Sequence, residues 1–425
     1  MRIEMAYGRT GLTVDLPDRA QVLQSPFVPG LTNEAESIRR ALREPIGSAP
    51  LASKIKPGNR VVIAHTDITR ATPNDRILPV LLAELESAGV RRADITLLNA
   101  LGTHRPQTDA ELREMLGPEI VKNYRCVQHD GRDDANLVSL GKTSRGHPVR
   151  INRLFLESDV RILTGFIEPH FFAGFSGGPK GVLPALAGAE SVLSNHGRDM
   201  IGHPRATWGI TEGNPIWEEM REVALRAKPT FLLNVAMNSR RQITGVFGGD
   251  LIAAHAAGCA FVRDRAMVPV DEPFDVVVTT NSGYPLDQNL YQCVKGMSGA
   301  AQVAREGGAI ILAAGCADGL PDHGRYTELL TKGGSPHGVL EMLAAPGFEA
   351  QDQWQVQIQA LIQQRTAVYV YSDGLTDEQI GRALLRPCRS IEKTVSALER
   401  EHGSAARIAV IPEGPQTIAW VRPRG

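Results

Sequence analysis

Short runs of apolar and β-branched residues recur along the chain, each followed by a glycine-bearing turn and an amphipathic segment. The first run, RVVIAHTD, covers residues 60–67. The segment 74–90 that follows has the spacing of an amphipathic helix, and Gly89 is expected to stop that helix. Because buried parallel strands read as continuous apolar runs, this alternation predicts an α/β fold with mainly parallel sheets. Further runs occupy residues 93–104, 159–171, 230–238, 274–283, 307–319, 366–374 and 407–414.

The alternation is interrupted at residues 263–275, RDRAMVPVDEPFD, by two prolines and mixed charge. A chain of 425 residues is also long for a single core. We therefore expect two α/β domains, an N-terminal one over residues 1–267 and a C-terminal one over 268–425, with a ligand cleft between them. The pattern leaves open whether the last strand packs back onto the first sheet.

Polar loops follow several of the predicted strands. In an open α/β sheet, ligands bind beyond the carboxyl ends of the strands, so these loops are candidates for a site. Three lie in the first predicted domain, at 65–75, 101–109 and within 168–197, and one lies in the second, at 281–300. Within the first domain, Thr108 with Glu111 also predicts a capping box at the start of a helix.

Charge and cysteine content narrow the class of protein. The 46 basic and 47 acidic residues nearly balance without a long basic run, which argues against a nucleic-acid or anionic-membrane partner. No stretch approaches the ~20 apolar residues of a membrane span, and no apolar core follows the first charges, so no secretory signal is expected. The five cysteines are scattered, odd in number and never in a CxxC pair, which favours reduced thiols in a soluble cytoplasmic protein over a disulfide framework or a zinc site.

One lysine, Lys180, lies in the glycine-rich stretch GFSGGPKG at residues 174–181. The stretch loosely resembles a phosphate-binding loop, but Pro179 removes a needed N–H and Gly181 replaces the magnesium-binding Ser or Thr. An exposed surface lysine is the simpler alternative. The flanking glycines would let a bulky group approach the backbone, and lysine amines form covalent bonds to carbonyl-type carbons, so we favour a functional Lys180.

Three of the 11 histidines stand in a suggestive context. His104 and His170 each end a predicted strand and begin a polar loop, while His196 follows an alanine-rich segment, 184–195, that is predicted to be helical. A neutral imidazole is a good ligand for nickel, copper or zinc. Because the chain has no HxH, HExxH or paired-cysteine spacing, a metal here is expected to take most of its ligands from a cofactor.

Two further pairs of polar residues lie in the candidate loops. Asp67 and Arg70 are three residues apart after a strand, and arginine grips a carboxylate with two parallel hydrogen bonds. An ordinary surface ion pair is the alternative. In the second domain, Asp287 is expected to cap a helix on which Gln292 and Lys295 share one face, toward a cleft or toward water.

Together these motifs resemble the nickel-pincer lactate racemase family. The stretch DITRATP at 67–73 is similar to the family's Asp-x-x-Arg loop, and GTHRP at 102–106 is similar to the loop of its first catalytic histidine. Residues 169–196 resemble the family signature almost throughout, and 290–298 resemble a segment of its C-terminal domain. The opening stretch 7–18 resembles its first strands, so the resemblance extends over nearly the whole chain.

The resemblance implies a role for each candidate residue. The family carries a pyridinium mononucleotide joined to a lysine as a thioamide, in which two sulfurs and a ring carbon hold nickel and one protein histidine completes the metal's ligands. Cofactor-biosynthesis proteins are then needed for maturation. The implied roles are catalytic bases for His104 and His170, the cofactor link for Lys180, the nickel ligand for His196, substrate contacts for Arg70, Gln292 and Lys295, and an orienting carboxylate for Asp67.

The resemblance also implies the reaction. The protein would be a 2-hydroxy acid racemase or epimerase, in which a hydride passes reversibly from C2 to the pyridinium ring and a 2-keto acid forms as the intermediate. The C2–H bond beside a carboxylate is barely acidic, so hydride transfer avoids a carbanion, while two bases serve the two faces of the alcohol. The sequence leaves open whether the substrate is lactate, a larger hydroxy acid or a sugar acid. Candidate pocket walls are Phe171, Phe172, Tyr291 and Trp354.

Two other functions fit parts of the sequence. A cofactor-free racemase could use His104 and His170 as two bases on a more acidic C–H bond, but it leaves Lys180 and His196 without a role. A non-catalytic protein that binds an organic acid or carries the nickel cofactor is the second alternative, although both candidate bases are present.

Overall fold

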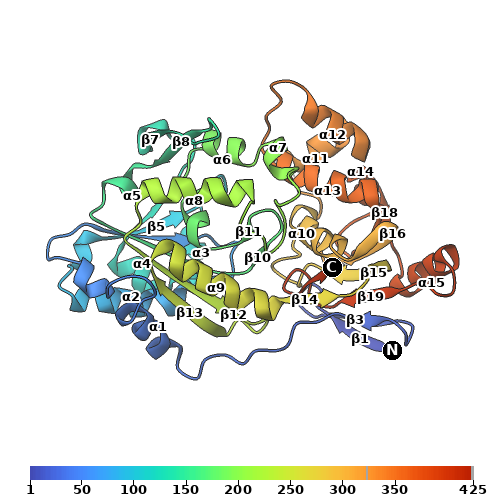
Figure 1. Ribbon diagram of the computed structural model, residues 1–425, viewed down its shortest axis with the longest axis horizontal. Coiled ribbons are helices and arrows are strands. Elements are labelled where there is room, and N and C mark those ends of the chain that lie inside the picture. Colours follow the sequence, from blue (N-terminus) through green and yellow to red (C-terminus); the bar gives the residue numbers. More distant parts are fainter. Residues whose placement is uncertain (322–323, 423–425) are drawn as a thin grey trace. The chain divides into compact units, whose positions relative to one another are not determined.

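The computed structural model describes residues 1–321 and 324–422, which form two compact units (Figure 1). The predicted boundary at residue 267 lies close to Arg265, where the last segment of unit 1 begins. Unit 1 also takes in the first residues of the chain and a short stretch from its middle. Unit 1 comprises Met1–Pro26, Gly197–Pro204 and Arg265–Gly425, and unit 2 comprises Phe27–His196 and Arg205–Asp264.

Unit 2 is built on a six-stranded sheet with the order β13-β12-β9-β4-β5-β6. All neighbouring strands pair in parallel except β12 and β13, which form an antiparallel edge. The mainly parallel α/β fold predicted from the apolar runs is thereby confirmed. The strands are β4 (Val61–Thr66), β5 (Ile95–Ala100), β6 (Arg125–Gln128), β9 (Val160–Phe166), β12 (Phe231–Met237) and β13 (Ile243–Gly249).

One face of this sheet is covered by the first helices of the unit. Ile77, Leu81 and Leu85 of α2 are fully buried with Val61 and Ile63 of β4 in a single cluster, and burial of each such side chain is worth ~1.5–3 kcal/mol. The helices of the unit are α1 (Glu34–Arg43), α2 (Asn74–Ser87), α3 (Asp109–Leu116), α4 (Pro118–Asn123), α5 (Arg153–Glu157), α6 (Ala189–Asn195), α8 (Pro215–Ala227) and α9 (Leu251–Ala266).

Smaller elements complete unit 2. The capping box predicted at Thr108 and Glu111 is confirmed, with the Glu111 carboxyl accepting from the Thr108 N–H at 2.7 Å. Two antiparallel hairpins follow, β7 (Leu137–Lys142) with β8 (Pro148–Asn152), and β10 (Pro169–His170) with β11 (Gly174–Phe175). Short 3-10 turns are η1 (Leu51–Lys54), η2 (Arg92–Asp94), η3 (Asp134–Asn136) and η4 (Gly178–Gly181).

Unit 1 contains a second six-stranded sheet, which is parallel throughout, with the order β18-β17-β16-β15-β19-β3. Its strands are β3 (Gln21–Val22), β15 (Phe274–Thr280), β16 (Ala304–Ala313), β17 (Ala367–Tyr371), β18 (Arg386–Pro387) and β19 (Ile408–Ile411). Its helices are α7 (Arg198–Ile201), α10 (Leu290–Ala301), α11 (Tyr326–Gly333), α12 (Pro336–Ala344), α13 (Gln353–Arg365), α14 (Asp377–Arg382) and α15 (Ile391–His402).

Two small sheets tie the ends of the chain into unit 1. β1 (Arg2–Met5) and β2 (Leu12–Asp15) form an antiparallel pair near the N-terminus. The last strand, β20 (Ile418–Val421), pairs in parallel with β14 (Met267–Val270). The last strand predicted from the sequence, at 407–414, corresponds to β19, which lies in the unit 1 sheet, and β20 also packs within unit 1.

The N-terminal segment also lies along the carboxyl ends of β15 and β19. The Ala6 N–H donates to the Pro412 carbonyl at 3.0 Å, and the Gly8 carbonyl accepts from the Tyr284 N–H at 2.8 Å. The Gly8 N–H donates to the buried Asp287 carboxyl at 2.7 Å. Backbone groups at this edge of the sheet are thus paired with the chain's own first residues.

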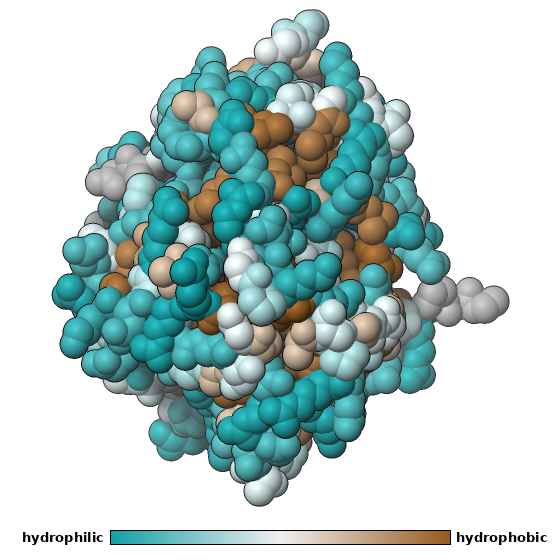
Figure 2. Space-filling view, turned by 90° about the vertical axis from the view of Figure 1, so that its left-hand side faces the viewer, coloured by the Kyte–Doolittle hydropathy of each residue, from teal (hydrophilic) through white to brown (hydrophobic). Residues whose placement is uncertain are grey.

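The surface is largely hydrophilic on the face that Figure 2 shows, with hydrophobic atoms visible in several places between polar side chains. Few large hydrophobic side chains are exposed among the described residues: Val22, Phe27, Ile46, Leu225, Tyr284 and Leu361. Within residues 1–321 and 324–422, none of the helices has the length and apolar character that a membrane crossing requires.

Candidate active site

Three candidate loops of unit 2 meet at the carboxyl edge of its sheet. Asp67 and Arg70 follow β4, His104 follows β5, and His170 lies just after β9. β4 is flanked by the next strand, β5, on one side and by the later strand β9 on the other, which makes this edge a topological switch point. Ligands bind at such points in open α/β sheets, so the sequence-predicted loops converge where a site is expected.

Asp67 and His104 form a dyad. The Asp67 carboxyl is 3% exposed and contacts Nδ1 of His104, while its other oxygen accepts from the Thr69 N–H and hydroxyl at 3.1 and 2.6 Å. Burial by itself raises the pKa of Asp67, but its charge interaction and hydrogen bond with His104, helped by Arg70 and Thr69, hold the pKa well below its usual range. The carboxyl thus fixes the His104 ring and leaves Nε2 to accept a proton.

His170 is a buried imidazole among aromatic rings. Its Nδ1 accepts from the Ala173 N–H at 3.3 Å. The rings of Phe171 and Phe172 lie 4.9 and 4.5 Å from it, centroid to centroid. His104 and His170 are therefore held in different ways, His104 by a carboxyl and His170 by a backbone N–H and aromatic packing.

Lys180 lies in the turn η4, which rests on two residues that the sequence did not single out. The Gly178 N–H donates to Oδ1 of Asn234 on β12 at 2.8 Å, and Nε2 of His255 on α9 lies 3.0 Å from the Ser176 carbonyl. A Cβ atom at Gly178, whose φ is +52°, would come within 2.4 Å of the His255 ring. The glycine is required here because the backbone packs directly on an imidazole.

His196 follows directly after α6, which begins at Ala189 and not at residue 184 as predicted. The ring is 3% exposed and meets Phe172 edge-on, with centroids 5.0 Å apart. Burial, and then the positive charge of Lys180, lower the pKa of His196 to about 3, so the imidazole is neutral at physiological pH. A neutral imidazole is the form of histidine that can bind a metal ion.

In unit 1, Gln292 and Lys295 come together on α10 as predicted, with Lys295 Nζ donating to Gln292 Oε1 at 3.2 Å. The expectation that Asp287 caps this helix is wrong. Asn289 is the cap, and Asp287 instead accepts the N–H groups of Gly8 and Gly315 at 2.7 and 2.8 Å. The reason is that Asp287 lies two residues before the capping position and accepts hydrogen bonds from the neighbouring loops instead of from the helix.

Two candidate pocket-wall residues of unit 1 also contact each other. Trp354 Nε1 donates to the Tyr291 hydroxyl at 3.2 Å, and Trp354 is buried. Tyr291 lies four residues before Lys295 on α10, so the two side chains share one side of that helix.

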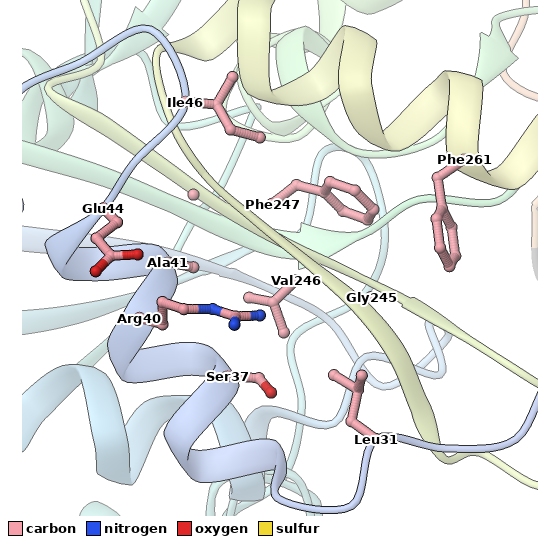
Figure 3. A pocket seen from close by; sticks show the side chains of 11 residues that line it. Leu31, Ser37, Arg40, Ala41, Glu44, Ile46, Gly245, Val246, Phe247 and Phe261 are labelled. Atoms are coloured by element: carbon pink, nitrogen blue, oxygen red, sulfur yellow. The ribbon is translucent and has the colours of Figure 1, made fainter.

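A surface pocket of about 280 Å³ between α1 and β13 lies apart from these residues (Figure 3). Its walls are mainly apolar, and Arg40 points toward Val246. None of the sequence-predicted site residues lines it, and it offers no histidine, so it is not part of the candidate site.

Comparisons with known proteins show which family the chain resembles. The family described as "Lactate racemase N-terminal domain" matches residues 7–209, and "Lactate racemase C-terminal domain" matches residues 270–419. A lactate racemase from Thermoanaerobacterium thermosaccharolyticum is 37% identical over 98% of both chains. A lactate racemase from Lactiplantibacillus plantarum is 36% identical over 97% of this chain and 98% of its own.

Solved structures give the same picture. The lactate racemase apoprotein of T. thermosaccharolyticum superposes with a TM-score of 0.91 at 35% identity and covers all of both chains. A Thermotoga maritima protein shares the fold at a TM-score of 0.67 and 18% identity, covering 93% of this chain and all of its own. The chain therefore belongs to the lactate racemase family.

Proposed function

We propose that the protein inverts the C2 centre of a 2-hydroxy acid by means of a nickel-pincer nucleotide carried on Lys180. Family membership makes it a racemase, which is an isomerase. The observation that carries the finer proposal is the convergence of the Asp67–His104 dyad and His170 at one sheet edge, in the same unit as Lys180 and His196.

The lactate racemase family uses a nickel-dependent cofactor, and the residues of unit 2 fit such a group. The glycine turn around Lys180 leaves no room for a Cβ at Gly178. His196 supplies one buried neutral nitrogen donor, which suits nickel. No group of three or more His, Cys, Asp or Glu side chains able to hold a metal occurs among the described residues. One protein ligand beside a modified lysine therefore matches a metal that arrives within an organic cofactor.

In this proposal Lys180 would hold the cofactor covalently, and His196 would bind its nickel. When bound, the group would supply an electron-poor ring that accepts a hydride from C2 and returns it. The chain's own residues handle the proton and the orientation. Nε2 of His104, made available by the Asp67 contact at Nδ1, would take the hydroxyl proton from one face of the alcohol, and His170 would serve the other.

The substrate carboxylate needs cationic partners. Arg70 lies three residues after Asp67, in the loop that follows β4 of unit 2. Lys295 and Gln292 lie on α10 of unit 1. Arg70 would bind the carboxylate with two parallel hydrogen bonds, while Lys295 and Gln292 would hold the carboxylate or the carbonyl oxygen of the keto acid. Asp67 would keep the ring of His104, the base, in the correct orientation.

The name of the relatives makes lactate the first substrate to test. The buried Phe171 and Phe172 beside His170 would suit a small apolar tail, since a polyol tail would need hydrogen-bond partners there. A cytoplasmic location and dependence on maturation proteins are parts of the same proposal. The five cysteines are all free thiols, which agrees with a reducing compartment.

The decisive experiment is intact mass and nickel analysis of protein co-expressed with a pathway that makes the pincer cofactor. A mass increase mapped to the Lys180 peptide, about one nickel per chain, and loss of both in Lys180→Ala are expected. Loss of optical activity from a panel of 2-hydroxy acids would then identify the substrate. Racemisation by a Lys180→Ala variant would instead support a cofactor-free two-base racemase, and cofactor uptake without turnover would support a binding protein.

A further inference from the structure

Helix α8 presents buried polar side chains to the segments that carry both His170 and His196. At its start Asn214, which is fully buried, donates from Nδ2 to the Phe172 carbonyl at 2.8 Å and to the Ile210 carbonyl at 2.9 Å. Its Oδ1 accepts the N–H of Ile216 at 3.1 Å and so caps the helix. The backbone two residues beyond His170 is therefore tied to the N-terminus of α8.

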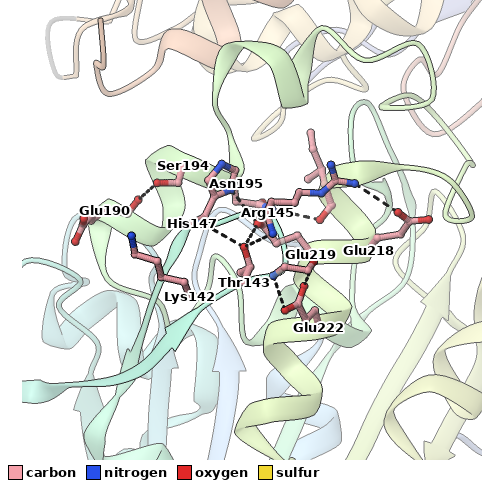
Figure 4. A network of polar contacts seen from close by, with 12 residues as sticks. Lys142, Thr143, Arg145, His147, Glu190, Ser194, Asn195, Glu218, Glu219 and Glu222 are labelled. Carbon is pink, nitrogen blue, oxygen red and sulfur yellow. Dashed lines mark hydrogen bonds and ion pairs between the residues drawn. The ribbon is translucent and has the colours of Figure 1, made fainter. Parts of the chain in front are cut away.

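The next turn of α8 carries Glu219, whose side chain is 1% exposed. One carboxyl oxygen accepts from the Thr143 hydroxyl at 2.7 Å and from His147 Nδ1 at 2.9 Å, both in the turn between β7 and β8. The other oxygen accepts from Nδ2 of Asn195 at 2.8 Å. Figure 4 shows these side chains converging on Glu219 from the hairpin and from the end of α6.

Asn195 is the last residue of α6 and precedes His196 directly. Its Nδ2 also donates to the Ile216 carbonyl of α8 at 3.3 Å, so its side chain is held at two points of that helix. α6 has only seven residues, and isolated helices shorter than ~12 residues are marginal in water. The contacts of Asn195 therefore hold the end of α6 against α8, and with it the backbone from which the His196 ring projects.

We propose that Glu219 and Asn195 are positioning residues for His196, which fix the direction of its imidazole before nickel binds. The proposal rests on the proposed role of His196 as the nickel ligand. Apolar packing alone could hold α6 in place, but a buried carboxyl with three donors specifies one arrangement and penalises the others. Because Asn214 holds the Phe172 backbone from the same helix, α8 also sets the position of the His170 segment relative to His196.

The test is Glu219→Gln in cofactor-loaded protein. The amide offers one acceptor oxygen in place of two and carries no charge. Either Asn195 or the pair Thr143 and His147 therefore loses its acceptor, and the bonds that remain are no longer charge-assisted. We expect the Lys180 adduct mass to be retained while nickel is lost about 10-fold faster on dialysis against a chelator, as for other partners that orient a metal ligand. Equal rates of nickel loss in wild type and Glu219→Gln would overturn the proposal.

Glu222→Gln is the matched control. Glu222 lies on the same helix, contacts the same hairpin through the Ser144 N–H and hydroxyl at 2.9 and 2.7 Å, and has no contact with Asn195 among those described. It loses the same charge, and nickel loss should match wild type. A Glu222→Gln protein that loses nickel as fast as Glu219→Gln would mean that any weakening of the hairpin is sufficient, which contradicts positioning through Asn195.

A second readout uses apoprotein labelled with ¹⁵N-histidine. The His196 ring signals should shift or broaden in Glu219→Gln and stay at their wild-type positions in Glu222→Gln. Where Glu219→Gln does not fold, Asn195→Ala replaces it, because it leaves Glu219 with two donors. Unchanged His196 signals in a folded variant would overturn the inference even if wild type took up no cofactor, whereas absence of a Lys180 adduct in wild type would overturn the proposed function.

Discussion

In both units a central parallel strand, β4 in unit 2 and β15 in unit 1, has the next strand of the chain on one side and a later strand on the other. The two carboxyl edges are nevertheless occupied differently. At β4 the loops present Asp67, Arg70 and the neighbouring His104. At β15 the edge is covered by the first residues of the chain, whose backbone bonds to Pro412, Tyr284 and Asp287.

The comparison shows that a switch point supplies only a location where backbone and side-chain polar groups come to a sheet edge. The role of such an edge depends on whether its polar groups form hydrogen bonds within the protein or are available to a ligand. In unit 1 the first residues of the chain pair with the groups at this edge, whereas in unit 2 the loops present acid–base and cationic side chains there. Four predictions follow from this contrast, in order of decreasing effect.

The largest effect is expected from removing a base at the unit 2 edge. His104→Gln and His170→Gln should each lower kcat by about 10²–10⁴-fold, the usual contribution of a positioned acid or base. The Lys180 adduct should be unaffected, which intact mass would verify. The exposed His337 pairs with Glu341 on helix α12 of unit 1 and is not part of the sheet edge, so His337→Gln serves as control. A kcat at the wild-type level in either active-site variant would remove that residue from the mechanism.

The turn under Lys180 should be the next most sensitive point. In Gly178→Ala the new methyl meets the His255 ring in a backbone conformation that disfavours it, and we expect a loss of about 2–4 kcal/mol in urea unfolding together with poor Lys180 modification. Gly181, in the same turn, would place a Cβ no closer than 3.6 Å to its neighbours. Gly181→Ala should therefore behave like wild type, and equal effects of the two changes would refute this reading of the turn.

At the unit 1 edge the effect should fall on stability and not on cofactor attachment. Asp287→Ala leaves the N–H groups of Gly8 and Gly315 without their acceptor, at a cost of about 1–3 kcal/mol in unfolding free energy. Asp318 is exposed on a nearby loop, so Asp318→Ala removes the same charge as a control. Loss of Lys180 modification in a folded Asp287→Ala protein would show that the two edges do not act separately.

The smallest effect concerns pH. Since the folded state lowers the pKa of Asp67, the ionised carboxyl contributes stability above its unfolded pKa of ~4, and that contribution is lost as pH falls through the lower folded value. Wild-type apoprotein should therefore lose more stability than Asp67→Asn between about pH 6 and pH 3, measured as urea midpoints. Identical pH slopes would mean that the dyad contributes nothing to folding.

Much of the unit 2 edge could be predicted from sequence because its signals are local. Apolar runs followed by polar loops located Asp67, His104 and His170 at strand ends, and the glycines around Lys180 marked the turn. The residues behind them could not be predicted in this way. Asn234, His255 and Glu219 lie on elements far along the chain, and only the tertiary structure brings them beneath the turn or beside α6.

Long-range pairing explains the other differences. Gln21 and Val22 read as an unremarkable polar and apolar pair, yet they pair with Ala409 and Val410 in the unit 1 sheet. The predicted cap at Asp287 was wrong for a related reason, because its partners Gly8 and Gly315 are distant in sequence. Helix-capping rules use only neighbouring residues in the sequence, so they cannot predict that a carboxyl will accept hydrogen bonds from a distant loop.

The pairing of β3 with β19 also bears on how the protein is made. β3 leaves the ribosome before unit 2, but its partner strand begins only at Ile408, whereas unit 2 ends at Asp264. At ~5–20 residues per second, β3 waits roughly 20–80 s for its partner. Unit 2 is complete well before then, so β3 is expected to stay unpaired, and open to chaperones or proteases, until β19 has been synthesised.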